Sequence, residues 1–276
     1  MSLRSLYYRL PVRLRYAARR IYYLPADVFH PLGEAYPPRG LIYTGGSGAA
    51  FAQQGREIRD FLLAHDLLDA RSRVLDIGSG IGRIAIPLTA VVTEGRYEGF
   101  EVVRLGVDWC RRHVQSQHPH FNFRYVDLHN DLYKAAGADA SAYTFPYPDG
   151  AFTLAIANSV FSHMVPAELV RYLGEAARVL VSGGRFYFTC FVLDEASEAA
   201  MERSDGLRFS EDRGYYRLLT ARVESANVAY DRAYLEREIA ASGLEIEHYY
   251  RGAWSGLAAG HPIAFQDNYV VRKGGG

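Results

Sequence analysis

A short apolar strand that ends in an acid and leads into alternating glycines constrains this chain more than any other feature. The strand covers residues 74–77 with Asp76 near its end, and the glycines are Gly78, Gly80 and Gly82. Glycine adopts positive φ and lets the backbone approach a ligand closely. A helix that starts after such a turn offers N–H groups to a carboxylate or phosphate. We therefore expect a ligand at this turn, at the carboxyl edge of a sheet.

Apolar strand patterns and helical patterns alternate along most of the chain. The strand patterns cover 73–77, 97–101, 121–126, 152–157, 185–192, 244–251 and 264–272, and the helical patterns 49–64, 81–89, 105–117, 166–180 and 231–241. Residues 152–157 are apolar almost throughout, as in a strand that is buried on both faces. This alternation predicts a parallel sheet with helices on both faces, an α/β fold.

The glycine spacing separates three classes of nucleotide site. A dinucleotide fold needs G-x-G-x-x-G, and a P-loop needs Lys followed by Ser or Thr after its glycines. This chain has G-x-G-x-G, and Gly82 is followed by Arg83. The motif D-x-G-x-G-x-G instead resembles motif I of class I S-adenosylmethionine-dependent methyltransferases.

The resemblance continues through residues 74–188. The next strand ends in Glu101, and the third expected strand is followed by Asp127. Residues 145–152 read Phe-Pro-Tyr-Pro-Asp-Gly-Ala-Phe, like the approach to the family's fourth strand. Residues 175–184, with Glu175 and Arg178, are similar to the segment that leads into its fifth. The chain departs from the family pattern at Thr153 and Ser182, two positions that we regard as structural.

The resemblance implies a Rossmann-like class I methyltransferase fold with a seven-stranded, mostly parallel sheet and an antiparallel last strand. It implies S-adenosylmethionine as the cofactor, with Glu101 on the ribose hydroxyls, Val102 on the adenine and Asp127 at the adenine edge. The full set of expected cofactor residues is Asp76, Gly78, Ser79, Gly80, Gly82, Glu101, Val102, Asp127, Leu128 and Asn158. Structural alternatives are helix capping by Asp76, a solvated strand end at Glu101 and turn capping by Asp127.

His163 is the candidate catalytic residue. Methyl transfer from a sulfonium mainly requires the nucleophile and the methyl group to be brought into line. A hydroxyl or amine nucleophile also benefits from a nearby base. His163 is the only histidine in residues 158–164, just after the fourth strand, and histidine titrates near neutral pH. The alternative is a histidine that only supports the loop. No metal is expected.

The acceptor is expected to be a small molecule or a glycan, methylated on oxygen. Asn158 is followed by Ser159-Val160 and neither cysteine follows a proline, so the sequence lacks the usual nucleic-acid methyltransferase motifs. Nucleic-acid substrates also usually need a basic face, whereas the chain beyond its N-terminal segment is mildly acidic. Two other hypotheses are a methyltransferase-like protein that binds S-adenosylmethionine without turnover, and a nicotinamide-dependent oxidoreductase, which the glycine spacing disfavours.

The N-terminal segment, residues 1–48, differs from the methyltransferase domain expected at 49–276. Residues 11–24 are expected to form an amphipathic helix followed by a capping loop. We expect the helix to pack on the domain or to cover an active site, and the alternatives are contact with an anionic membrane through residues 4–24 and nucleic-acid contact. Six arginines precede the first acid, which is Asp27: Arg4, Arg9, Arg13, Arg15, Arg19 and Arg20.

Two further segments are expected to border the site. Residues 207–229 are interpreted as a lid or substrate wall, and residues 43–46 as a loop that closes over the cofactor. Tyr215, Tyr216 and Trp254 are candidate stacking surfaces.

The chain is expected to be cytoplasmic, with contact at the inner membrane surface as an addition. Cys110 and Cys190 are its only cysteines, and we expect both to be buried and unpaired. No apolar run reaches the roughly 20 residues needed to span a bilayer, and arginines interrupt the N-terminal apolar residues. No sequence feature marks an oligomeric interface.

Overall fold

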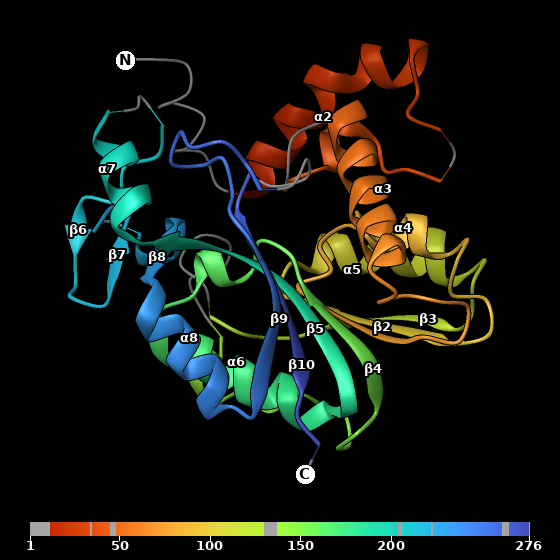
Figure 1. The fold of residues 1–276 in the computed structure, drawn as a ribbon. Coiled ribbons are helices and arrows are strands. Elements are labelled where there is room, and N and C mark those ends of the chain that lie inside the picture. Colours follow the sequence, from red (N-terminus) through yellow and green to blue (C-terminus); the bar gives the residue numbers. More distant parts are fainter. Residues whose placement is uncertain are drawn as a thin grey trace.

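The computed structural model describes residues 12–33, 35–44, 48–129, 137–203, 206–221, 223–260 and 265–275. Its centre is a parallel sheet in the order β3-β2-β1-β4-β5 (Figure 1). The strands are β1 (Arg73–Ile77), β2 (Arg96–Glu101), β3 (Phe121–Tyr125), β4 (Phe152–Ala157) and β5 (Leu180–Leu193). The first five of the seven predicted strand patterns are therefore confirmed.

The last strand is antiparallel, as the resemblance implied. β10 (Asp267–Lys273) runs antiparallel to β5 on one side and to β9 (Leu244–Tyr250) on the other, and Val270 faces Tyr187 in the register. The core order is therefore β3-β2-β1-β4-β5-β10-β9. These seven strands are those that the sequence predicts.

Helices cover both faces of the sheet. One hydrophobic cluster lies between the sheet and α3 (Ala49–Ala64), α4 (Ala85–Leu88) and α5 (Arg104–Cys110). A second lies under α6 (Pro166–Val179) and α8 (Arg232–Ala241). The α8 helix is capped by Asp231, whose side chain accepts from the Tyr234 N–H. In α6, Pro166 occupies the first turn, where the lack of an N–H costs nothing.

Two predicted helices differ from the structure. The helix expected at 81–89 is reduced to Ala85–Leu88, because Gly80 and Gly82 have φ of +60° and +86° and a right-handed helix cannot include such residues. The helix expected at 105–117 is α-helical only to Cys110 and continues as a π-helical turn over Arg111–Gln115.

The described part of the sheet has ten strands rather than seven. β5 extends beyond the core, and its residues 191–193 pair in parallel with β8 (Val228–Asp231). β7 (Tyr216–Leu218) and β6 (Glu211–Asp212) follow as antiparallel neighbours, beside α7 (Glu195–Arg203). Three short strands of the segment 207–231 therefore continue the sheet.

Of the three candidate stacking residues, Tyr215 alone is exposed. Trp254 is buried in a third cluster with Phe191 and Phe209, which corrects its predicted stacking role. Tyr215 is half-exposed and its ring centroid lies 4.5 Å from that of Tyr234. Tyr216 packs on the main core.

The N-terminal helix is longer than predicted and turns its apolar side outward. α2 spans Val12–Phe29 and includes Pro25. Instead of packing on the domain, Leu14, Ile21 and Leu24 are exposed. The helix is held by its polar side, where Asp27 forms a 2.9 Å ion pair with Arg39 of the 3₁₀ turn η1 (Arg39–Leu41). Residues 1–11, including Arg4 and Arg9, lie outside the described residues.

Candidate functional site

A cavity of about 310 Å³ lies at the carboxyl ends of β1, β2 and β4. Cavities of this size take small molecules and cofactors. The residues that line it are Tyr43, Thr44, Asp76, Ile77, Gly78, Ser79, Gly80, Arg83, Ile84, Phe100, Glu101, Val102, Asn158, Ser159, Val160, His163, Met164, Tyr172 and Gln266.

The glycine turn after β1 forms one wall of this cavity. Gly78 has φ of +71°, and a Cβ there would lie 2.7 Å from Cγ2 of Val160. Only glycine suits both the backbone conformation and the close approach. The N–H groups of Gly78 and Ser79 both donate to the carbonyl of Phe100 on β2, which fixes the turn. The Ser79 hydroxyl is buried beside the cavity without a hydrogen-bond partner in the described structure.

Glu101 joins the end of β2 to the glycine turn. One carboxylate oxygen accepts from the Gly80 N–H and the other from the Val103 N–H, each at 2.8 Å. Burial raises the pKa of this carboxyl, while those hydrogen bonds lower it in part. An ionised carboxylate has about four acceptor sites, so Glu101 keeps capacity for hydroxyl donors in the cavity.

Asp76 is a buried carboxyl at the back of the same wall. The Tyr97 hydroxyl donates to it at 2.5 Å. Burial raises the pKa of Asp76 to about 7, opposed in part by that hydrogen bond and by the charge of Arg83. The group is therefore poised between its two protonation states near neutral pH.

His163 also lines the cavity and is held by Ser225 of the 3₁₀ turn η5 (Glu224–Ala226), just before β8. It ends the 3₁₀ turn η4 (Phe161–His163) after β4, and its Nδ1 lies 2.8 Å from the carbonyl oxygen of Ser225. A carbonyl only accepts, so Nδ1 carries the proton and the neutral ring has its lone pair on Nε2. Burial lowers the pKa of His163, against the effect of its carbonyl partners. The neutral form is thus favoured at neutral pH.

A second, more polar cavity of about 180 Å³ adjoins the first. The two share Arg83, Asn158, Ser159 and Gln266. Ser159 has φ of +58°, an unusual conformation for a non-glycine residue. The other residues that line the second cavity are Gln54, Glu57, Ile58, Tyr187, Thr189, Phe265 and Asn268.

Hydrogen bonds hold the residues at this junction. The Ser159 N–H donates to Oγ1 of Thr189 at 2.8 Å. Oε1 of Gln266 accepts from the hydroxyls of both Ser159 and Thr189. The junction therefore presents several polar groups in fixed positions.

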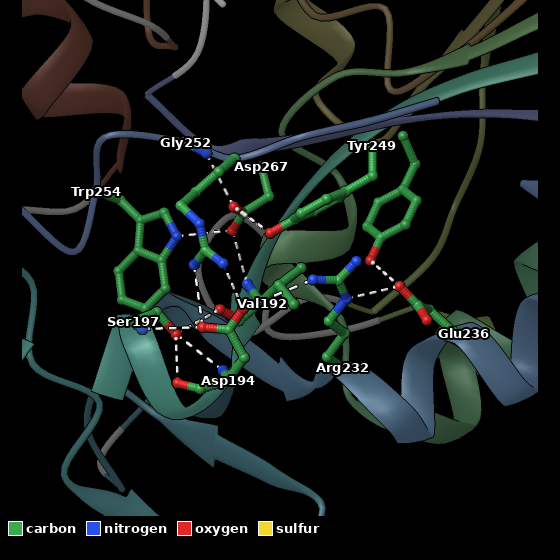
Figure 2. A network of polar contacts seen from close by, with 11 residues as sticks. Val192, Asp194, Ser197, Arg232, Glu236, Tyr249, Gly252, Trp254 and Asp267 are labelled. Carbon is green, nitrogen blue, oxygen red and sulfur yellow. Dashed lines mark hydrogen bonds and ion pairs between the residues drawn. The ribbon is translucent and has the colours of Figure 1, made fainter. Parts of the chain in front are cut away.

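A buried carboxylate fixes the strand end that carries Gln266. Figure 2 shows Asp267 among four donors: the Gly252 and Val192 N–H groups, the Tyr249 hydroxyl and the Trp254 indole. Burial raises the pKa of Asp267, while these donors lower it in part. Its position next to Gln266 ties the cavity to the β5–β10 pairing.

Two of the motif residues recognised in the sequence act on the loop before β4. Arg178 donates to the carbonyls of Phe145 and Tyr147 and to the carboxylates of Asp149 and Glu175. Glu175 in turn accepts from the Phe145 N–H at 2.7 Å. These contacts position β4 and so the residues that follow it.

The structure brings most of the predicted site residues to one cavity. Those that line it are Asp76, Gly78, Ser79, Gly80, Glu101, Val102, Asn158 and His163. Gly82, Asp127 and Leu128 do not line it. A Cβ on Gly82 would lie 3.1 Å from Sγ of Cys110, Leu128 is buried in the core, and the Asp127 side chain is exposed. The individual roles stay predictions.

Sequence reasoning missed Tyr172, Gln266 and Arg83. Tyr172 belongs to the buried stripe of α6, and a buried position at helical spacing does not by itself mark a ligand contact. Gln266 precedes an antiparallel strand, and no sequence motif marks it. Tyr43 and Thr44 of the predicted closing loop do line the cavity, whereas Gly45 and Gly46 lie outside the described residues.

The described residues contain no group of three His, Cys, Asp or Glu that could hold a metal ion. Within the same part of the chain, no helix is long and apolar enough to cross a membrane. Cys110 and Cys190 are both buried and unpaired, as expected.

A family model described as "Methyltransferase domain" matches residues 75–188. That range begins in β1 and ends in β5, and it holds most of the cavity wall. The chain carries a class I methyltransferase domain. It is an enzyme of the S-adenosylmethionine-dependent type, and S-adenosylmethionine is its cofactor.

Solved structures share the fold of this methyltransferase. The [4+2]-cyclase SpnF has 19% sequence identity and a TM-score of 0.55, covering 95% of this chain and 96% of that chain. A second structure is a geranyl diphosphate C-methyltransferase from Streptomyces coelicolor A3(2) in complex with Mg²⁺, geranyl-S-thiolodiphosphate and S-adenosyl-L-homocysteine. It has 14% sequence identity and a TM-score of 0.51, covering 79% of this chain and 76% of that chain. The magnesium protoporphyrin IX methyltransferase from Synechocystis PCC 6803 has 14% sequence identity and a TM-score of 0.50, covering 80% of this chain and 83% of that chain.

The cavity fits the cofactor that the family uses. Glycines allow the backbone of residues 78–80 to approach a ligand, and the buried Ser79 hydroxyl offers a donor and an acceptor there. Two acids, Asp76 and Glu101, suit the ammonium and the ribose hydroxyls of such a ligand. Val102 and Phe100 supply apolar surface beside Glu101.

Proposed function

We propose that this methyltransferase transfers the methyl group of S-adenosylmethionine to an oxygen atom of a small molecule or glycan. When bound, the cofactor supplies an electrophilic methyl group on a sulfonium. In this proposal Asp76, Ser79, Glu101 and Val102 hold the cofactor. The acceptor enters from the second cavity.

The observation that carries the proposal is the hydrogen bond of His163 Nδ1 to the Ser225 carbonyl, which leaves the ring neutral with its lone pair on Nε2. A neutral imidazole with its lone pair on Nε2 can take the proton of an attacking hydroxyl. The Ser225 carbonyl then stabilises the resulting imidazolium through the Nδ1–H. An amine acceptor would need a base less than a hydroxyl does, because its lone pair is available once it is deprotonated.

The second cavity supports a hydroxylated acceptor. Its lining carries amides, hydroxyls, a carboxylate and a guanidinium, with Ile58 and Phe265 as its apolar members. Hydrogen-bonding walls of this kind favour a polyol or sugar over a hydrocarbon, since buried polar groups left without partners cost binding free energy. Nothing in this argument requires nucleic acid.

The test is a screen with S-adenosylmethionine labelled in its methyl group. Sugars, phenols, carboxylic acids and amines are offered in parallel, and the labelled product is treated with mild base. An ether product keeps its label, whereas a methyl ester loses it. Transfer to amines alone would contradict the proposal, and so would transfer that is unchanged in His163→Asn.

Cytoplasmic location and peripheral membrane contact of residues 4–24 are separate proposals. The arginines before Asp27 support them. The cavity has no bearing on either.

A further inference from the structure

In α2 the large apolar side chains point away from the domain and polar ones point toward it, the reverse of an ordinary surface helix. A helix on such a domain buries its apolar stripe and exposes its polar one. In α2 the half-buried residues include Arg19, Tyr23, Ala26 and Asp27, which recur at helical spacing. The exposed large apolar side chains are Leu14, Ile21, Tyr22, Leu24, Val28 and Phe29.

This exposed apolar face is concentrated on one element. It holds more than half of the large hydrophobic side chains that are exposed in the described structure. Ile21 is 74% exposed and Phe29 74% exposed, values far above those of most apolar residues in the chain. Contiguous apolar surface of this kind marks an interaction site.

The charges around the face indicate what covers it. α2 carries Arg13, Arg15, Arg19 and Arg20 against one acid, Asp27. That acid is already paired with Arg39. A helix with an exposed apolar face, an exposed Arg20 and a net positive charge complements an anionic lipid surface, where the apolar side chains enter the headgroup region and cationic groups bind phosphates. A second copy would instead bring like charges together.

The geometry points to α2 as an interfacial helix that docks the enzyme on an anionic membrane through Leu14, Ile21, Leu24, Val28 and Phe29. The contact includes residues beyond Leu24 and uses the outward face of a helix whose inner face is fixed. Figure 1 shows α2 at the edge of the molecule beside α3, away from α6 and α8. The face is therefore accessible to a flat surface.

The docking helix is also connected to the active site over a short distance along the chain. A Cβ on Gly40 would lie 2.6 Å from Cα of Arg20, so α2 and η1 pack backbone to backbone. After η1, Ile42 is fully buried, and Tyr43 and Thr44 line the cofactor cavity. Docking would thus fix the cavity wall relative to the bilayer. This step, which rests on the proposed function, suits a lipid-linked acceptor.

The test is co-sedimentation of the full chain with vesicles of phosphatidylcholine alone or mixed with phosphatidylglycerol. The wild type should bind the anionic vesicles and bind neutral ones at least roughly tenfold more weakly. The double variant Ile21→Glu, Val28→Glu should lose at least roughly tenfold in anionic binding, because it puts charge into the apolar contact. Arg20→Gln should lose about fivefold.

A matched control is Val170→Glu with Ile246→Glu. These side chains are 37% and 40% exposed on α6 and β9, and the substitutions should leave vesicle binding unchanged. All variants should bind S-adenosylmethionine like the wild type in calorimetry, which shows that they are folded and separates this inference from the proposed function.

Three results would overturn the inference. They are equal binding of the wild type to neutral and anionic vesicles, retained binding in the double variant, and a stable dimer in mass measurements that the double variant dissociates.

Discussion

At the residue scale, the roles of two titratable groups follow from their surroundings. His163 and Asp76 line the same cavity. Burial pushes the pKa of His163 down and that of Asp76 up. In both cases burial favours the neutral form of the side chain, and Asp76, with a pKa of about 7, can exchange its proton near neutral pH.

Replacement of His163 tests its role as the base. His163→Asn should lower kcat by roughly 10²-fold to 10⁴-fold with little change in the affinity for S-adenosylmethionine. Because the pKa of His163 is lowered, wild-type activity should rise with pH with a midpoint below the ordinary imidazole value of 6.5. The variant should lack this limb of the profile. His248→Asn, at an exposed site on β9, should behave as the wild type. An unchanged kcat in His163→Asn would leave His163 as a support for the loop.

The pH dependence of stability tests Asp76. Its pKa is about 7 in the folded protein against 3.8 for the ordinary group, so the folded state holds the proton more tightly than the unfolded chain. The contribution is complete below pH 3.8 and is lost as pH rises through 7, by up to about 4 kcal/mol in unfolding free energy.

Asp76→Asn cannot ionise and provides the comparison. Its stability relative to the wild type, measured without cofactor by denaturant unfolding, should increase from pH 5 to pH 8. A constant difference across this range would show that Asp76 does not titrate there.

At the element scale, the sequence predicts long elements well and short or strained ones poorly. The strand 152–157 matches β4 because its apolar run is set by burial on both faces. The prediction of a helix over 81–89 was wrong for the residues before Ala85, because the positive φ of Gly80 and Gly82 outweighs the apolar pattern. The strands β6 and β7 are two and three residues long, too short for an alternating pattern to be read.

The Asp267 cluster is an element-scale device that sequence patterns do not reveal. Asp267→Asn keeps one acceptor oxygen but turns an N–H₂ group toward two of four donors (Figure 2). The free energy of unfolding should fall by about 2–4 kcal/mol, because buried donors lose their partners. The matched control is Asp212→Asn at the exposed end of β6, which should change stability by less than about 0.5 kcal/mol. Equal effects of the two substitutions would mean that the cluster is not a stabilising link.

At the scale of the whole molecule, the fold and the cofactor cavity could be predicted because ordered motifs mark both. Glycines, Asp76 and Glu101 occur at fixed points along strands whose carboxyl ends must meet. The orientation of α2 could not be predicted. An amphipathic pattern identifies an apolar face but does not say whether the domain covers it, and here the Asp27–Arg39 pair turns the polar face inward.

The central claim is that this cavity binds S-adenosylmethionine, and calorimetric titration of the wild type and Glu101→Ala tests it directly. We predict micromolar binding to the wild type and at least roughly tenfold weaker binding to the variant, which loses the acceptor for two ribose hydroxyls. Val170→Glu, on the surface of α6, should bind like the wild type. No measurable binding to the wild type, or equal binding to Glu101→Ala, would contradict the account of the site.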